Sequence, residues 1–208
     1  MIAIVDYDVG NVGSVQNMLR KVGAQATITR DPTVLRAADK LILPGVGAFD
    51  EAVHNLRRFE LFDLLNELVQ EEGKPILGVC LGAQLMTKSS EEGSQAGFGW
   101  LDARIVKFKS VSPQPLRIPH MGWNLVNPVR PELEIFQGVA RPMRFYFVHS
   151  YHMVVDSPEI ALAHTPYGQD FCSVLGKGNI LAMQFHPEKS HSYGLQVYRN
   201  FVERFQSC

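Results

Sequence analysis

The chain has 208 residues, 46% of them hydrophobic, which is enough to bury an ordinary core, and we expect one domain spanning residues 1–208. Twenty basic and 21 acidic residues give a formal net charge of −1, which favours neither nucleic acid nor an anionic membrane as a partner. The sequence contains no apolar run of membrane-spanning length, no visible signal peptide and only three widely spaced cysteines, so we expect a cytoplasmic protein without a disulfide framework.

The first hundred residues predict strands that alternate with helices. We expect strands at 2–5, 26–29, 40–43 and 76–79, a helix at 14–22, and two helices within 48–72 that break near 58–60. Repeats of a strand followed by a helix are typical of a parallel sheet that helices cover on both faces.

Beyond residue 100 the pattern changes to shorter strands. We expect strands at 104–108, 144–148 and 160–164, a hairpin of 171–175 with 180–185, and a closing helix at 194–205. The predicted fold class is α/β: a single domain with a central, mostly parallel sheet covered by helices on both faces, and additional antiparallel strands in the C-terminal half.

The strand at 76–79 leads into a cysteine between two glycines, Gly78-Val79-Cys80-Leu81-Gly82, and then into a helix-compatible stretch. Glycines permit a sharp turn that a Cβ would obstruct, so Cys80 would stand at the apex of a nucleophile elbow at the end of the sheet. The free N–H groups and positive dipole at the start of the next helix would favour the thiolate. The pentapeptide alone is equally compatible with a buried cysteine in a glycine-containing turn.

A second candidate segment, Gln184-Phe185-His186-Pro187-Glu188-Lys189-Ser190, follows an apolar run. Proline cannot continue a central strand, so we expect the strand to stop at His186. In an extended chain, residues i and i+2 lie on the same side, which places Glu188 beside His186. A cysteine nucleophile needs a base and the base needs a group that orients it, so we predict Cys80, His186 and Glu188 as the catalytic residues. Taken by itself, this segment is also compatible with a surface turn.

With these segments the sequence resembles the class I glutamine amidotransferases that use a Cys-His-Glu triad, and most closely the glutaminase subunits of imidazole glycerol phosphate synthases of histidine biosynthesis. The resemblance runs through nearly the whole chain. It is carried by Asp6-Tyr7 with Gly10-Asn11, Pro44-Gly45-Val46-Gly47, Cys80-Leu81-Gly82 with Gln84, Pro119 to Asn124, Phe147 to Tyr151, and Gln184 to Ser190. Asp8 and the stretch Thr87-Lys88-Ser89-Ser90 depart from the family pattern.

The resemblance implies that Cys80 attacks the side-chain amide of L-glutamine, releases ammonia and forms a γ-glutamyl thioester that water hydrolyses. His186 would take the thiol proton and return it to the departing nitrogen, and Glu188 would orient His186. The backbone N–H of Leu81 is placed for an oxyanion hole by the elbow itself, and the resemblance adds the N–H groups of Gly45 and Val46. We expect no cofactor and no metal site.

The resemblance also implies substrate-binding residues. Gln84 lies one helical turn after Cys80, and Glu92 would pair with the ammonium group of glutamine. The backbone of His149, Ser150 and Tyr151 is a third candidate.

The glutaminase would occupy nearly all of the chain, which leaves no part to consume the ammonia. Because ammonia in neutral water becomes mostly ammonium, a poor nucleophile, we expect docking onto a synthase. The resemblance implies a 1:1 heterodimer with a (β/α)8-barrel cyclase subunit that makes imidazole glycerol phosphate and an aminoimidazole carboxamide ribotide. We expect Asn11, His120, Met121, Trp123, Asn124 and Lys189 at or near that interface.

Three alternatives remain open. A paralogous glutaminase that supplies ammonia for surface-sugar amidation would share every motif above. A different Cys-His hydrolase, such as a peptidase, is disfavoured by Gln84 and by the segment 44–47. A non-catalytic binding subunit should lack a member of the triad, and all three members are present.

Overall fold

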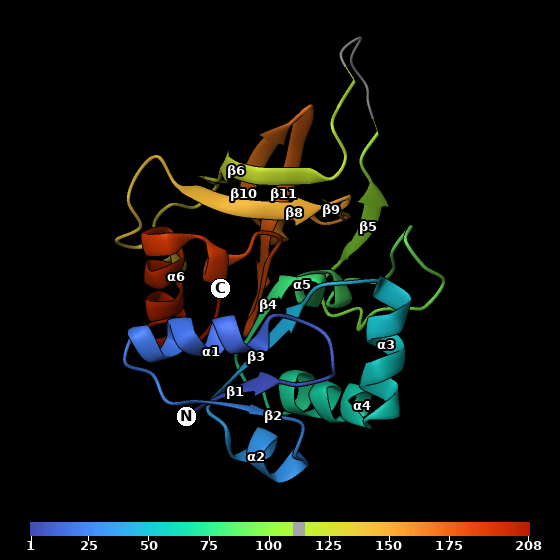
Figure 1. Ribbon diagram of the computed structural model, residues 1–208, viewed down its shortest axis with the longest axis vertical. Helices are drawn as coiled ribbons and strands as arrows, with labels where there is room; N and C mark the ends of the chain where they lie inside the picture. Colours follow the sequence, from blue (N-terminus) through green and yellow to red (C-terminus); the bar gives the residue numbers. More distant parts are fainter. Residues whose placement is uncertain (110–114) are drawn as a thin grey trace.

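Five parallel strands form the centre of the sheet in the computed structural model, which describes residues 1–109 and 115–208 (Figure 1). They lie side by side in the order β2-β1-β3-β4-β12. Their bounds are Ile2–Val5 (β1), Ala26–Thr29 (β2), Lys40–Gly45 (β3), Ile76–Cys80 (β4) and Ile180–Met183 (β12). Every residue of β1, β3, β4 and β12 is buried, as expected for strands covered on both faces.

Antiparallel strands continue the sheet beyond β12. They follow β12 in the order β11-β10-β7, and β9 pairs with β11 on one side and with β5 on the other. A separate two-stranded ribbon is formed by β6 and β8. The bounds are Ala103–Lys107 (β5), His120–Leu125 (β6), Asn127–Pro128 (β7), Arg144–His149 (β8), Tyr151–Val155 (β9), Ala161–Tyr167 (β10) and Gln169–Lys177 (β11).

Helices pack on both faces of the sheet. On one face lie α1 (Val12–Lys21) and α6 (His191–Glu203), and on the other α2 (Pro32–Ala37), α3 (Phe49–Arg58), α4 (Leu61–Asn66) and α5 (Leu81–Leu85), each burying its apolar side in one of two core clusters. A π-helical turn, Glu67–Glu71, extends α4, and short 3₁₀ turns lie at Glu134–Phe136, Pro158–Ile160 and Pro187–Lys189. None of the described helices combines the length and apolar character needed to cross a membrane.

The predicted fold class is confirmed, with differences at particular boundaries. The predicted break between the two helices falls at Glu60, whose φ of +58° interrupts the helical path. The strand expected to reach His186 already ends at Met183 in β12. The closing helix begins at His191, earlier than predicted, so Gly194 lies inside it. This position requires glycine, because a Cβ there would be 1.7 Å from the carbonyl oxygen of Pro187.

Strands β6, β7 and β9 are absent from the sequence-based prediction. In β6, the sequence His-Met-Gly-Trp-Asn-Leu lacks an alternation of apolar and polar residues, and Gly122 has a φ of +120°. Strand β9 follows β8 after one residue, so the two are not separated by a recognisable turn. Both strands are specified by pairing with distant segments rather than by local sequence.

Lys40 joins the sheet to the end of the last helix. Its side chain is only 6% exposed, and its Nζ donates to the carbonyl oxygens of Phe201, Val202 and Phe205 at 2.7, 3.0 and 2.6 Å. Phe201 and Val202 belong to the C-terminal turn of α6, where a helix leaves its carbonyl groups unpaired, and Phe205 lies just beyond it. The positive charge also lies at the negative end of the helix dipole.

We predict that Lys40→Met destabilises the fold by roughly 2–4 kcal/mol, because the variant keeps the methylene packing but leaves buried carbonyl groups without a donor. Urea unfolding followed by circular dichroism measures the loss. Lys74→Met is the matched control, since Lys74 is only half-buried and its Nζ donates to two carbonyl groups, and we expect a smaller loss there. Equal losses would contradict the role given to Lys40.

Candidate active site

Cys80 stands at a strained turn between β4 and α5. Its φ is +53° and its ψ −109°, a combination that costs a residue with a side chain roughly 1–3 kcal/mol. The turn fits tightly against β3, because a Cβ on Gly82 would lie 1.8 Å from the carbonyl oxygen of Leu43. A Cβ on Gly78 would lie 2.7 Å from Met86 Cε. Both glycines are therefore required by close packing, as the elbow predicts.

His186 and Glu188 form a buried pair. Nδ1 of His186 lies 2.8 Å from Glu188 Oε1, and the two side chains are 1% and 2% exposed. The contact arises in the 3₁₀ turn Pro187–Lys189, not in an extended strand as the spacing argument assumes. The main chain of His186 is also held, since its N–H donates to the Tyr146 carbonyl and its carbonyl accepts from the Ser190 hydroxyl.

The imidazole of His186 is electrostatically coupled to the thiol of Cys80. Burial lowers the pKa of His186, but interactions with the nearby Cys80 thiol and with Glu188 outweigh it and raise the pKa to about 10. Nε2 of His186, the ring nitrogen that does not contact Glu188, is buried and makes no hydrogen bond within the described residues, so it is free to exchange a proton. The structure thus brings the cysteine, the imidazole and the carboxylate together at one edge of the sheet.

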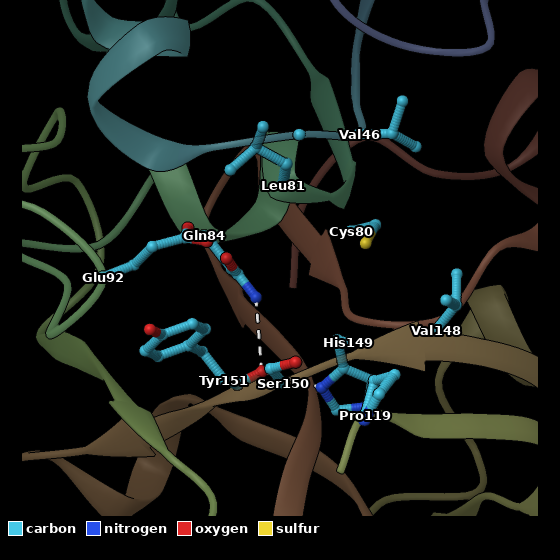
Figure 2. Close-up of a pocket in the computed structure, with 11 residues that line it drawn as sticks. Val46, Cys80, Leu81, Gln84, Glu92, Pro119, Val148, His149, Ser150 and Tyr151 are labelled. Atoms are coloured by element: carbon cyan, nitrogen blue, oxygen red, sulfur yellow. Dashed lines mark hydrogen bonds between the residues drawn. The ribbon is translucent and has the colours of Figure 1, made fainter.

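Cys80 opens into a cavity of about 320 Å³, within the size range of small-molecule sites. Figure 2 shows Gln84 and Glu92 on one side of this cavity and the segment 149–151 on another. The lining residues are Val46, Gly47, Cys80, Leu81, Gln84, Glu92, Pro119, Val148, His149, Ser150 and Tyr151. All five predicted substrate-binding residues line the cavity, together with two of the three residues predicted for the oxyanion hole. Gly45 does not line it and is instead the buried last residue of β3, in register with Cys80.

A pair of glutamine side chains connects the cavity wall to the thiol. Gln184 Nε2 lies 3.7 Å from Cys80 Sγ, and Gln84 Nε2 donates to Gln184 Oε1 at 3.0 Å. Gln84 Nε2 also reaches the carbonyl oxygen of Tyr151 at 3.3 Å (Figure 2). The sequence gives Gln184 no recognisable role, because its contact with Cys80 depends on the pairing of β12 with β4.

Glu92 combines a structural contact with a place on the cavity wall. Its Oε2 accepts a hydrogen bond from the backbone N–H of Phe49 at 3.1 Å, at the start of α3. Burial raises the pKa of Glu92, and the nearby Asp50 carboxylate adds to the rise, although the Phe49 N–H opposes it. The carboxylate therefore gains from a cationic partner in the cavity.

His149 reaches the cavity through its side chain as well as its backbone. Its Nδ1 lies 2.7 Å from the carbonyl oxygen of Tyr151 and so donates to it, which leaves Nε2 to accept from Nδ1 of His120 at 2.9 Å. His120 Nε2 in turn accepts from Asn124 Nδ2 at 3.1 Å. Burial lowers the pKa of His149 to about 3 and that of His120 to about 4, so both rings are neutral at pH 7.

The residues predicted for a partner interface differ in exposure. Met121 and Trp123 are 62% and 44% exposed, and the Trp123 ring stacks on His191. Lys189 is exposed and its Nζ lies 5.7 Å from the centre of the Tyr146 ring. Asn11, just before α1, and Asn124 are half-buried, whereas His120 is 3% exposed and lies inside the chain of side-chain contacts described above.

Comparisons with known proteins agree with this arrangement. The family model of class I glutamine amidotransferases matches residues 3–205. The imidazole glycerol phosphate synthase subunit HisH 2 of Pseudomonas aeruginosa is 47% identical over 98% of this chain and 99% of its own length. The subunit of the same name from Methanococcus maripaludis is 46% identical over 98% of this chain and all of its own.

Solved structures show the same fold at lower sequence identity. The structure of PurLQS from Thermotoga maritima superposes with a TM-score of 0.72 at 16% identity, covering 97% of this chain and 96% of that one. A glutamine amidotransferase from the same organism gives a TM-score of 0.60 at 19% identity, over 90% of this chain and 75% of that one. The chain belongs to the class I glutamine amidotransferase family and, within it, to the group of HisH subunits.

Proposed function

We propose that this chain hydrolyses L-glutamine to glutamate and ammonia through a thioester on Cys80, and that the ammonia passes to a (β/α)8-barrel cyclase subunit of imidazole glycerol phosphate synthase in histidine biosynthesis. The observation that carries the proposal is the coupling of Cys80, on the wall of the cavity, to the buried His186–Glu188 pair. The names of the full-length relatives support the choice of pathway and partner.

We infer that the proton of the Cys80 thiol passes to His186, whose raised pKa favours the imidazolium. The thiolate of Cys80 attacks the amide carbon of glutamine, and the imidazolium of His186 protonates the departing nitrogen. Glu188 holds the ring through Nδ1 and leaves Nε2 for proton transfer. Water then attacks the γ-glutamyl thioester and regenerates the thiolate with His186 acting as the base.

The oxyanion of the tetrahedral intermediate needs backbone donors that are in place before the reaction. The N–H of Leu81 belongs to the residue directly after the nucleophile, and Gly45 and Val46 come from the end of β3, the strand beside Cys80. We assign the N–H groups of Leu81 and Val46, which line the cavity, to the oxyanion hole, and Gly45 holds Val46 in place from the end of β3. Glu92 and Gln84, with the backbone of 149–151, line the same cavity and bind the ammonium and carboxylate groups of the substrate.

The cyclase docks on the exposed strand β6 and the neighbouring turn. Met121 and Trp123 are large apolar side chains exposed to solvent, and Lys189 supplies a positive charge next to them. Since β6 pairs with β8, which ends in the cavity wall at His149, docking at β6 adjoins the substrate site. We expect little glutaminase activity from the chain alone and strong stimulation by the cyclase with its ligand.

We predict that Cys80→Ala abolishes glutamine-dependent turnover of the heterodimer, because no other group in the cavity can form the thioester. The same heterodimer should still produce imidazole glycerol phosphate from added ammonium salt, since that reaction bypasses the glutaminase. The two rates are measured side by side with the cyclase substrate in excess. Glutamine hydrolysis that survives in Cys80→Ala would rule out the proposed nucleophile.

We predict that Glu188→Gln moves the alkaline limb of kcat/KM to lower pH. Interaction with Glu188 contributes to the raised pKa of His186, and losing an opposite charge at this distance removes about 1–3 pH units. Activity requires the imidazolium, so it should be lost at a lower pH than in the unmodified heterodimer, where we expect the limb near pH 10. Glu203→Gln removes an exposed carboxylate from α6 and should leave the profile unchanged; a shift of equal size in that control would argue against the assignment.

We predict that Trp123→Ala weakens the cyclase complex by about 2 kcal/mol, or roughly thirtyfold in Kd, as expected for an aromatic anchor at an interface. Calorimetric titration of the cyclase measures the change. Val129→Ala serves as the control, because Val129 is 53% exposed but lies outside the predicted interface. If both variants bind the cyclase as tightly as the parent chain, β6 is not the docking strand.

A further inference from the structure

Tyr7 is a buried polar side chain beside the candidate oxyanion loop, and the function proposed above gives it no task. It lies two residues after the end of β1, its side chain is 0% exposed, and its hydroxyl donates to the carbonyl oxygen of Pro44 at 2.5 Å. Burial raises the pKa of Tyr7 far above its usual value, with a smaller contribution from the nearby Cys80. The hydroxyl therefore keeps its proton and acts as a donor.

The hydrogen bond from Tyr7 fixes a whole peptide unit. The Pro44–Gly45 peptide is trans, and a trans peptide is planar, so a carbonyl held on one side also fixes the direction of the Gly45 N–H on the other. Gly45 by itself would rotate freely, because it has no side chain to restrict its backbone angles. With this peptide held, rotation of the loop is confined to the peptides that follow Gly45.

The surroundings leave no room for a side chain at position 45. A Cβ on Gly45 would lie 2.7 Å from the Tyr7 hydroxyl, 2.7 Å from Gly82 N and 2.8 Å from Leu81 Cβ. From another side, Gly10 approaches Pro44 so closely that a Cβ there would lie 3.2 Å from its carbonyl carbon. The peptide is thus enclosed by the elbow, by Gly10 and by the phenol, and among these the phenol supplies a directional hydrogen bond.

We propose that Tyr7 is a positioning residue for the glutaminase reaction, whose hydroxyl anchors the Pro44–Gly45 peptide so that the backbone N–H of Val46 faces the oxyanion formed at Cys80. This inference rests on the proposed function and adds to it a residue that touches neither glutamine nor the thiol. Tyr7 acts through the backbone of Gly45 and Val46, and its effect belongs to the transition state rather than to substrate binding.

The test is Tyr7→Phe in the heterodimer with the cyclase and its ligand. Removing an oxyanion donor outright costs about 10²–10³ in rate, so loosening one should lower kcat for glutamine by about tenfold or more, with KM changed by less than roughly twofold. Glutamate γ-semialdehyde adds to the cysteine as a thiohemiacetal with a charged oxygen, and its Ki should rise by the same factor as kcat/KM falls. A purely structural role would not link these two quantities.

Two further variants separate the hydrogen bond from packing. Incorporating 4-methylphenylalanine at position 7 fills the space of the hydroxyl without a donor and should reproduce the loss even if Tyr7→Phe folds poorly. Incorporating 4-aminophenylalanine restores a donor and should recover most of kcat. Tyr167→Phe is the matched control, because its hydroxyl also donates to a backbone carbonyl, that of Arg117, and its kcat should stay at the parent value.

The outcomes for the two proposals are distinct. If the parent heterodimer hydrolyses glutamine but Tyr7→Phe and the 4-methylphenylalanine variant keep the parent kcat and the parent Ki for the aldehyde, the role of Tyr7 is overturned. The ammonia-dependent rate of each variant should equal that of the parent. If this rate falls by the same factor as the glutamine-dependent rate, the role of Tyr7 is overturned as well. If the parent heterodimer itself does not hydrolyse glutamine, the proposed function fails instead.

Discussion

The site depends on the parallel pairing of β4 with β3 on one side and with β12 on the other. The registers place Gly45 beside Cys80 and Met183 beside Val79, so all three strands end at the same edge of the sheet. Each strand then delivers one chemical feature at its carboxyl end: the loop to which we assign oxyanion donors, a thiol, and a turn with an imidazole and a carboxylate. A slip of one residue in either register would separate these features.

The strain at Cys80 is balanced by contacts with the neighbouring strand. The elbow can approach β3 only because positions 45 and 82 lack a Cβ, and the close fit then prevents the turn from relaxing. Strained backbone persists where the surrounding structure determines it. The pattern of glycines around the cysteine thus reflects contact between two strands at least as much as it reflects the freedom of the turn itself.

The sequence predicts most of the parallel half of the fold, and the reasons are local. Strands β1 and β2 have the predicted bounds, and buried apolar runs such as 76–79 are recognisable without their neighbours. Cys80, His186 and Glu188 can be proposed as a group from the sequence because each lies in a compact motif, and the structure places their side chains together. The contact between His186 and Glu188 is correct, but its geometry is that of a 3₁₀ turn, because Pro187 starts such a turn instead of merely ending the strand.

What the sequence does not predict arises from long-range contact. Gln184 reaches Cys80 across the pairing of β12 with β4, and Lys40 finds its carbonyl partners at the far end of the chain. Strand β6 has no periodic apolar signal, since only His120 among its six residues is buried. In each case the decisive partner is distant in sequence, and nothing in the local pattern specifies it.

The two-stranded ribbon has a consequence for how such a protein can diverge. Its register pairs Trp123 with Tyr146 and His120 with His149, so one strand bears exposed aromatic surface while the opposite strand reaches the wall of the cavity. A substitution in β6 that adapts its exposed surface to a different partner protein alters the packing of β8. Related genes that acquire different ammonia acceptors should therefore change both strands together, and covariation between them should be stronger than within the parallel sheet.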